Sequence, residues 1–120
     1  MFYYGNDHRL ISEEDAGESY NTHEWKAFIE CSNKEITKNF ISKVDFKLHP
    51  TFNPSKVTVN KLPLSITRWG WGVFEIKIVV HWKKWMNKKP TTFPHMLSFD
   101  EDGEKNTFLI DVNKQDYENL

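Results

Sequence analysis

The sequence predicts an all-β protein, an immunoglobulin-like antiparallel sandwich of about seven to eight strands. Several short segments alternate apolar and polar residues, which is the pattern of half-buried strands. Proline and glycine lie at or near the gaps between these segments, as turn residues should. No segment shows a sustained helical period, so two packed antiparallel sheets are the expected architecture.

The clearest strand runs from Val73 to His81, where apolar residues occupy nearly every second position. The other strands are predicted from shorter stretches with the same alternation. They lie around 25–31, 44–48, 57–59, 62–66, 97–99 and 108–112. Together these segments make about seven strands, the number expected of a small two-sheet sandwich.

The chain of 120 residues has room for one compact domain. Residues 1–21 are predicted to be a flexible N-terminal arm, because most of that stretch is polar or acidic and shows no periodicity. Residues 22–112 are predicted to form the folded domain, and residues 113–120 a polar C-terminal tail. No apolar run is long enough for a membrane-spanning helix, so no membrane partner is expected.

The composition argues against several classes of function. The five histidines form no close pair with one another or with a cysteine at the spacing of zinc sites, so no metal is expected. Cys31 is predicted to be a buried core thiol, and no catalytic grouping or cofactor motif is visible, so the chain is not expected to be an enzyme. The net charge of -1 argues against direct nucleic-acid binding.

Two short stretches place aromatic rings on predicted turns. The first is Leu48–Phe52, in which Thr51 offers a hydroxyl beside a ring, and His49 is close enough along the chain to orient it. The second is Gly70–Ile76, in which glycines flank Trp71 and let its backbone approach a ligand or adopt a positive φ. Such rings and polar groups predict a slot for a flat, neutral ligand, although each ring taken alone fits a hydrophobic core or an interface equally well.

The order and spacing of three motifs resemble those of the YEATS family. The motifs are Thr22-His23-x-Trp25, then Lys43-Val44-x-Phe46-x-Leu48-His49-Pro50-Thr51-Phe52 followed by Pro54, and then Gly70-Trp71-Gly72-x-Phe74-x-Ile76. The resemblance covers roughly residues 22–112. A further stretch, Pro94-His95-x-Leu97-x-Phe99, looks most similar to the YEATS subunits shared by the TFIID and TFIIF transcription complexes and by chromatin remodellers.

This resemblance implies a nuclear reader of acylated lysine, acetyl or crotonyl, on the histone H3 tail, acting within a transcription or chromatin complex. It implies that Phe52 and Trp71 form the two walls of the slot. Thr51, held by His49, would bond the side-chain amide of the ligand, and the Trp71 backbone N–H would bond the acyl oxygen. The remaining implied residues keep the walls close or line the pocket: Gly70, Gly72, Phe28 and Phe74. Met96 stands where some family members carry an acidic residue that meets a basic residue of the tail, and the resemblance leaves open whether the acidic residues at 100–102 replace it.

Two other readings of the sequence remain open. In one, the chain is a structural subunit without acyl-lysine binding, which docks a protein partner through Trp69, Trp82 and Trp85. In the other, four lysines beside Trp82 and Trp85 bind single-stranded nucleic acid. These lysines are Lys83, Lys84, Lys88 and Lys89.

Overall fold

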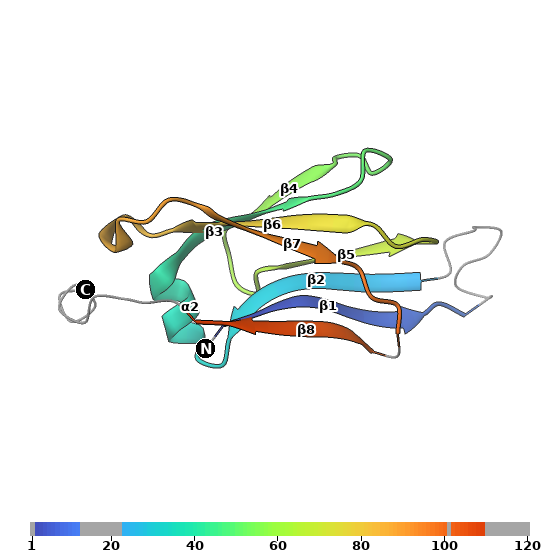
Figure 1. Cartoon of the computed structure of the whole chain (residues 1–120), viewed down its shortest axis with the longest axis horizontal. Coiled ribbons are helices and arrows are strands. Elements are labelled where there is room, and N and C mark those ends of the chain that lie inside the picture. The colour runs from blue at the N-terminus through green and yellow to red at the C-terminus, as the bar shows by residue number, and fades with distance from the viewer. Residues whose placement is uncertain (1, 13–22, 101, 110–120) are drawn as a thin grey trace.

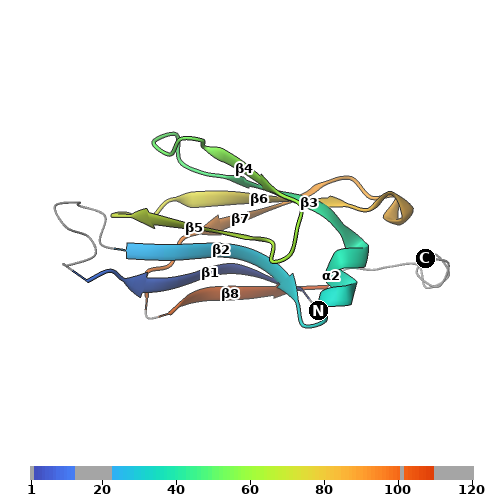
Figure 2. The ribbon, with the colours of Figure 1, turned by 180° about the vertical axis from the view of Figure 1, so that it is seen from behind.

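The computed structural model describes residues 2–12, 23–100 and 102–109. Two four-stranded antiparallel sheets pack face to face, with the strand orders β5-β2-β1-β8 and β4-β3-β6-β7 (Figures 1 and 2). The strands are β1 (Phe2–Leu10), β2 (His23–Cys31), β3 (Ile41–Lys47), β4 (Lys56–Val59), β5 (Ser65–Gly70), β6 (Glu75–Trp82), β7 (Thr91–Met96) and β8 (Gly103–Phe108). The predicted immunoglobulin-like sandwich is therefore confirmed, with eight strands.

Alternation explains most of the core. In β6, Ile76, Ile78 and Val80 are fully buried. Glu75, which precedes them, and Lys77, which lies between the first two, are exposed. The predicted inward positions of β2 and β3 are buried in the same way, because successive side chains of a strand point to opposite faces. These inward faces of both sheets form one hydrophobic core between the layers.

The N-terminal segment corrects a prediction. Residues 2–10 are not a flexible arm but strand β1, which lies inside its sheet and pairs with β2 on one side and β8 on the other. Phe2 is only 3% exposed and stacks on Phe108. The sequence of β1 shows no apolar and polar alternation, because its buried positions include Asn6, which is held by hydrogen bonds, and Gly5, which lies against β8. The rest of the predicted arm, from residue 13 on, and the predicted tail at 113–120 lie outside the described residues.

Two short helices, α2 (Lys34–Phe40) and η1 (Lys84–Met86), lie together at one end of the sandwich (Figure 1). The Asn33 side chain caps α2 by accepting a hydrogen bond from the Glu35 backbone N–H at 2.9 Å. Phe40 at its end packs edge-on against Trp85. The helix α2 was not predicted, because its seven residues make fewer than two complete turns and are too few to show a helical period.

Several strand boundaries also differ from the predictions. The strand expected at 108–112 is β8, which begins at Gly103 and ends at Phe108, and residues 110–112 lie outside the described residues. The strand expected at 62–66 is β5, which begins only at Ser65 and leaves Leu62 exposed. The strand expected at 97–99 ends earlier, because β7 covers Thr91–Met96 and Leu97 follows it as a buried loop residue. Within the described part of the chain, no helix is long and apolar enough to cross a membrane.

Candidate functional site

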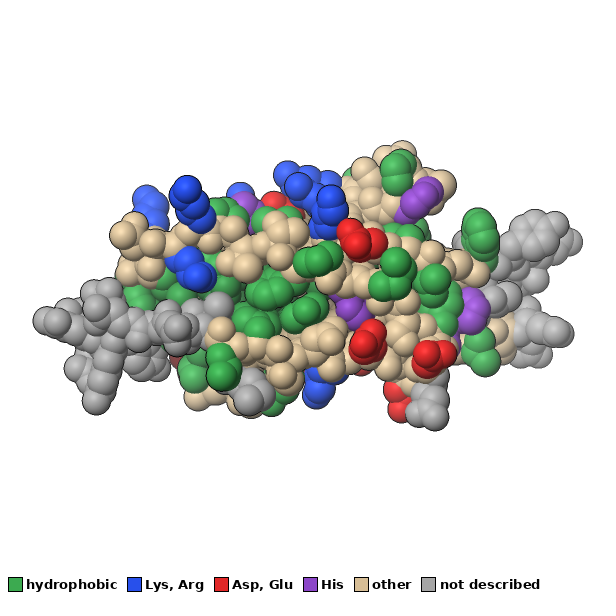
Figure 3. Space-filling model, in the orientation of Figure 1, with side chains coloured by type: hydrophobic (Ala, Val, Ile, Leu, Met, Phe, Trp, Pro, Cys, Tyr) green, Lys and Arg blue, Asp and Glu red, His purple; other side chains and the backbone are tan. Residues whose placement is uncertain are grey.

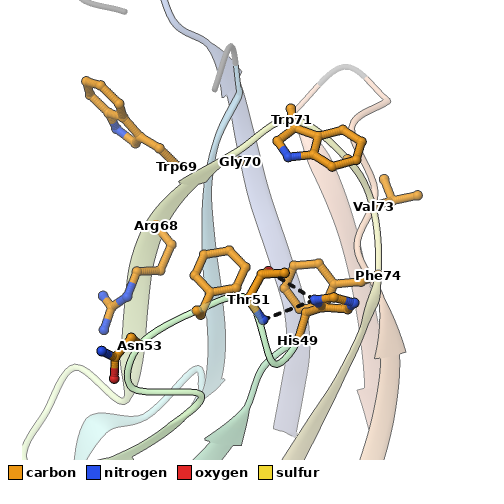
Figure 4. Close-up of a pocket in the computed structure, with 11 residues that line it drawn as sticks. His49, Thr51, Asn53, Arg68, Trp69, Gly70, Trp71, Val73 and Phe74 are labelled. Atoms are coloured by element: carbon orange, nitrogen blue, oxygen red, sulfur yellow. Dashed lines mark hydrogen bonds between the residues drawn. The ribbon is translucent and has the colours of Figure 1, made fainter. Parts of the chain in front are cut away.

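The two loops singled out by their rings meet at the end of the sandwich opposite α2 (Figures 1 and 4). The loop after β3 and the loop between β5 and β6 enclose an open pocket of about 570 Å³. Its lining residues are His49, Thr51, Phe52, Asn53, Arg68, Trp69, Gly70, Trp71, Gly72, Val73 and Phe74. Seven of the eight predicted site residues are thus brought together by the fold.

Backbone hydrogen bonds hold the loop after β3 in a compact turn. The Leu48 N–H donates to the Ser55 carbonyl at 2.6 Å, and the Phe52 N–H donates to the His49 carbonyl at 3.0 Å. These bonds close the loop at its base and at its tip. The ring of Phe52 is therefore placed by the backbone and not by side-chain packing alone.

The polar part of the pocket is the pair His49 and Thr51. The Thr51 backbone N–H donates to Nδ1 of His49 at 3.2 Å, and the Thr51 hydroxyl lies 3.0 Å from the same nitrogen (Figure 4). A nitrogen that accepts from a backbone N–H carries no proton, so the hydroxyl also donates to it. The lone pairs of the Thr51 oxygen consequently stay available to accept a bond from a ligand N–H.

Aromatic rings form the inner part of the pocket. Phe52 and Phe74 lie 5.4 Å apart between centroids, and Trp25 meets both of them edge-on at 5.9 and 5.8 Å. Trp25 is 1% exposed, and its indole N–H has no hydrogen-bond partner among the residues that the structure describes. Trp25 was predicted to be a core residue. Its contact with the pocket rings was not predicted, because alternation does not reveal which loop covers the end of a strand.

Trp71 is the exposed wall of the pocket. Its side chain is 76% exposed, and it lies at the turn above His49 and Phe74 (Figure 4). The ring contacts of Phe52 within the described residues reach Trp25 and Phe74 but not Trp71. Phe52 and Trp71 line one pocket without closing on each other, so the space between the two loops stays open.

The two glycines beside Trp71 differ in their surroundings. Neither has a positive φ, so the conformational reason predicted for them is wrong. A Cβ at Gly70 would lie 3.5 Å from Nε1 of Trp25 and 4.0 Å from the Phe52 ring, whereas one at Gly72 would meet nothing within 4 Å. The distances at Gly70 are ordinary van der Waals contacts, so neither position requires glycine for reasons of space.

Phe28 does not belong to this pocket, contrary to the prediction. It lies on the outer face of the other sheet, in a shallow hollow between Lys26 and Glu30. Its ring is nonetheless 6% exposed. Alternation had correctly placed Phe28 on the polar side of its strand, with Lys26 and Glu30.

Four lining residues were not predicted as site residues: Asn53, Arg68, Trp69 and Val73. Arg68 and Trp69 lie near the end of β5, which pairs with β2, and they face the loop after β3 across the pocket. Their position next to the Gly70–Gly72 stretch was the available signal. No cluster of three or more metal-binding side chains occurs in the described ranges of the chain.

The aromatic residues of the two alternative readings are mostly covered. Trp82 is 7% exposed, and its indole N–H donates to the Thr91 hydroxyl at 3.0 Å. Trp85 is half-buried, and its indole donates to the Asn39 carbonyl at 2.9 Å. Neither ring is free to stack on a base, and of the three tryptophans proposed for docking only Trp69 is exposed.

Comparison with known proteins agrees with this geometry. The model of the YEATS family matches residues 20–101. The chain is 35% identical over 107 residues to a "Protein AF-9 homolog" of Emericella nidulans, covering 85% of this chain and 38% of that protein. It is 40% identical over 92 residues to the AF-9 homolog of Eremothecium gossypii, covering 72% and 44%. It is also 29% identical to transcription initiation factor TFIID subunit 14 of Schizosaccharomyces pombe, covering 80% and 40%.

Solved structures of a related domain have the same fold. The Yaf9 YEATS domain recognising an H3K122suc peptide superposes with a TM-score of 0.79 at 31% identity, covering 88% of this chain and 77% of that one. The Yaf9 YEATS domain bound to H3K27ac superposes with a TM-score of 0.79 at 26% identity, covering 98% and 88%. This chain spans less than half the length of the curated relatives named above. Because the family match extends over more than half of the chain, the protein belongs to the YEATS family.

Proposed function

We propose that this domain binds an acylated lysine of the histone H3 tail between Phe52 and Trp71, as part of a nuclear transcription or chromatin complex. The observation that carries the proposal is the convergence of two loops on one open pocket with rings and a polar pair. Support comes from related domains of the same fold that hold acylated H3 peptides.

The polarity of the pocket matches a secondary amide. The Thr51 hydroxyl donates to His49, so its oxygen accepts the N–H of the acylated lysine side chain. The acyl oxygen requires a donor, and the Trp71 backbone N–H takes that role. No hydrogen bond within the described part of the chain uses this N–H. One donor and one acceptor satisfy the amide when it leaves water.

The same pocket disfavours an unmodified lysine. An ammonium group would enter a slot whose lining includes Arg68 and, among the described residues, no carboxylate. Moving an unpaired charge into such an apolar site costs several kcal/mol, because the site cannot replace the water around it. Acylation removes the charge and supplies a flat group that stacks on the rings.

Acetyl and crotonyl groups should differ modestly in affinity. A conjugated acyl chain adds flat surface beside the rings, worth on the order of 0.5–1.5 kcal/mol if the values for aromatic pairs apply. The peptide loses conformational freedom on binding, so a dissociation constant near micromolar, about -8 kcal/mol, is the natural scale.

Calorimetric titration with H3 tail peptides tests the proposal. We expect peptides carrying one acetyl- or crotonyl-lysine to bind with a micromolar Kd, and the unmodified peptide to bind at least about a hundredfold more weakly. Trp71→Ala should weaken acyl-peptide binding by tenfold or more, since it removes one wall.

Leu109→Ala is the control, because this side chain is exposed and does not line the pocket. It should change the Kd by less than about threefold. Equal affinity for acylated and unmodified peptides would contradict the proposal, as would unchanged binding by the Trp71→Ala variant.

A further inference from the structure

The outer face of the sheet β4-β3-β6-β7 carries lysines side by side on three neighbouring strands. Lys47 of β3 is the direct partner of Lys56 on β4 and of Lys77 on β6. Lys43 lies on the same face of β3, opposite His81. All four lysines are exposed. Like charges in direct cross-strand pairs destabilise a sheet, so this row has no evident structural benefit.

Few acidic groups balance this row. Asp45 lies among the lysines but is only 8% exposed, and it already binds His81 at 2.8 Å and the Thr58 hydroxyl at 2.6 Å. Its remaining ion pair, with Lys56, is long at 4.0 Å. Among the described residues of this face, the other acid is Glu75, which lies two residues before Lys77 on the same side of β6. No ion pair in the described ranges involves Lys43, Lys47 or Lys77.

The positive surface continues beyond the strands. Residues 41–99 contain ten of the sixteen Lys and Arg residues of the chain but only two of its seventeen Asp and Glu residues. Four exposed lysines follow β6 around η1: Lys83, Lys84, Lys88 and Lys89. Figure 3 shows Lys and Arg side chains gathered along the edge of the molecule formed by this sheet, with most of the visible acidic side chains farther along the body.

The dimensions of this surface suit a polyanion. Three neighbouring strands span about 10 Å, at a spacing near 4.8 Å between strands. The extended backbone from Lys77 to Lys83, which directly follows β6, spans about 20 Å. Hereafter the lysine face means Lys43, Lys47, Lys56, Lys77, Lys83 and Lys84. It is a rigid, gently twisted surface of positive charge, because most of its members stand on paired strands.

We propose that the lysine face binds the phosphate backbone of duplex DNA without reading its sequence. Lysine is depleted from protein–protein interfaces, whereas it is a usual phosphate ligand in DNA complexes. The apolar residue among these lysines, Val79, is only 9% exposed and provides no anchor for a protein partner. Lys43, Lys47, Lys56 and Lys77 stand on the surface of paired strands, which cannot enter a groove, so their contacts are limited to phosphates.

This surface is independent of the acyl-lysine pocket, since none of its lysines lines that pocket. It also differs from the single-strand reading of the sequence, which needs Trp82 and Trp85 as stacking platforms. Duplex binding through phosphates requires no exposed ring. The charge of -1 for the whole chain concealed this face, because fifteen of the seventeen acidic residues lie outside residues 41–99 in the sequence.

Fluorescence anisotropy with a labelled 30-base-pair duplex tests the proposal on the whole chain. We expect binding at 50 mM salt that weakens steeply by 200 mM, because each neutralised phosphate contributes about -0.9 to the slope of log K against log salt. The double variant Lys47→Gln/Lys77→Gln should reduce the steepness of that slope by about 2 and weaken binding at 50 mM salt by tenfold or more.

The matched control is Lys26→Gln/Lys105→Gln, which removes the same charge from the other sheet. It should leave both affinity and slope nearly unchanged, and thermal melting should show that both double variants are folded. Equal losses in the two pairs would overturn the proposal in favour of a nonspecific effect of net charge. Absence of binding at 50 mM salt would also overturn it, and so would preferential binding of a polyglutamate peptide, which would indicate an acidic protein partner.

Discussion

At the scale of single residues, the site depends on one polar pair whose donor and acceptor roles are set by the backbone. His49 Nδ1 accepts the Thr51 N–H, and this forces the hydroxyl to donate to the same nitrogen. The loop therefore presents an acceptor to the ligand and not a donor. This detail distinguishes an amide N–H from a carbonyl at the same place, which a hydrophobic slot alone cannot do.

Replacing Thr51 tests that assignment. In Thr51→Val the shape of the side chain is kept but the acceptor is lost, so the amide N–H of the ligand is buried without a partner. We expect acyl-peptide affinity to fall about tenfold, equivalent to about 1.4 kcal/mol. Thr51→Ser keeps the hydroxyl and should stay within about threefold of the parent in the same calorimetric titration. A Val variant that binds as tightly as the parent would contradict the role of the hydroxyl.

At the scale of elements, β1 and β8 approach each other unusually closely. A Cβ at Gly103 would lie 2.0 Å from the Asn6 carbonyl oxygen, and Gly103 has a φ of +115°. A side chain there would both strain the backbone and push the two strands apart. The strand that the sequence analysis took for a flexible arm is thus held by a contact that only glycine permits.

Substitution of Gly103 measures this contact. Gly103→Ala should lower the free energy of unfolding by about 1–3 kcal/mol, because a backbone atom and not a flexible side chain blocks the new methyl group. The melting temperature should fall by several degrees, as followed by circular dichroism. Gly72→Ala is the matched control, since no atom lies within 4 Å of its Cβ position, and it should stay within about 0.5 kcal/mol. Equal melting temperatures for the two variants would contradict the close approach of β1 and β8.

At the scale of the whole molecule, a buried polar cluster ties the two sheets together. Asn6 of β1 accepts at Oδ1 from the Ser98 N–H at 2.9 Å and from Nε2 of His95 on β7 at 2.7 Å. Its amide group donates to the Ser98 carbonyl at 2.9 Å. Burial lowers the pKa of His95, and this outweighs the nearby Glu104, which acts to raise it. The ring is therefore held neutral where it joins the layers.

Stability should depend on pH through this cluster. A histidine with a lowered pKa binds its proton less tightly in the folded state, so its contribution is fully present above about pH 6.5 and is lost as the pH falls below that value. His23 acts in the same direction, because burial and the neighbouring His8 lower its pKa. We expect urea midpoints to be lower at pH 5 than at pH 7.

Two variants locate the groups responsible. His95→Gln should reduce stability at pH 7, because it perturbs a buried hydrogen bond, and should also flatten the difference between pH 7 and pH 5. His23→Gln should remove only the part of the pH dependence that comes from His23. The double variant should therefore show a smaller difference in stability between pH 7 and pH 5 than either single variant. If His95→Gln keeps the full difference between the two pH values, the histidine that joins the sheets is not the titrating group.

The sandwich and the two loops that carry seven of the pocket residues could be predicted from the sequence. These features follow from local patterns: alternation marks the buried faces of β2, β3 and β6, and turn residues mark the loops that carry the rings. The place of Phe28 in the pocket was implied by the family resemblance and was wrong, whereas alternation had put its ring on the outer face of its strand, where the structure has it.

The strand formed by the N-terminal segment and the clustering of lysines on one face could not be predicted, because both depend on how distant segments pack. The polar pattern of β1 is compatible with a central strand because partners distant in sequence satisfy Asn6 and accommodate Gly5. Lys47, Lys56 and Lys77 lie far apart in the chain and become neighbours through strand pairing. Contacts of this kind depend on register and packing between distant segments, which no local pattern of residues specifies.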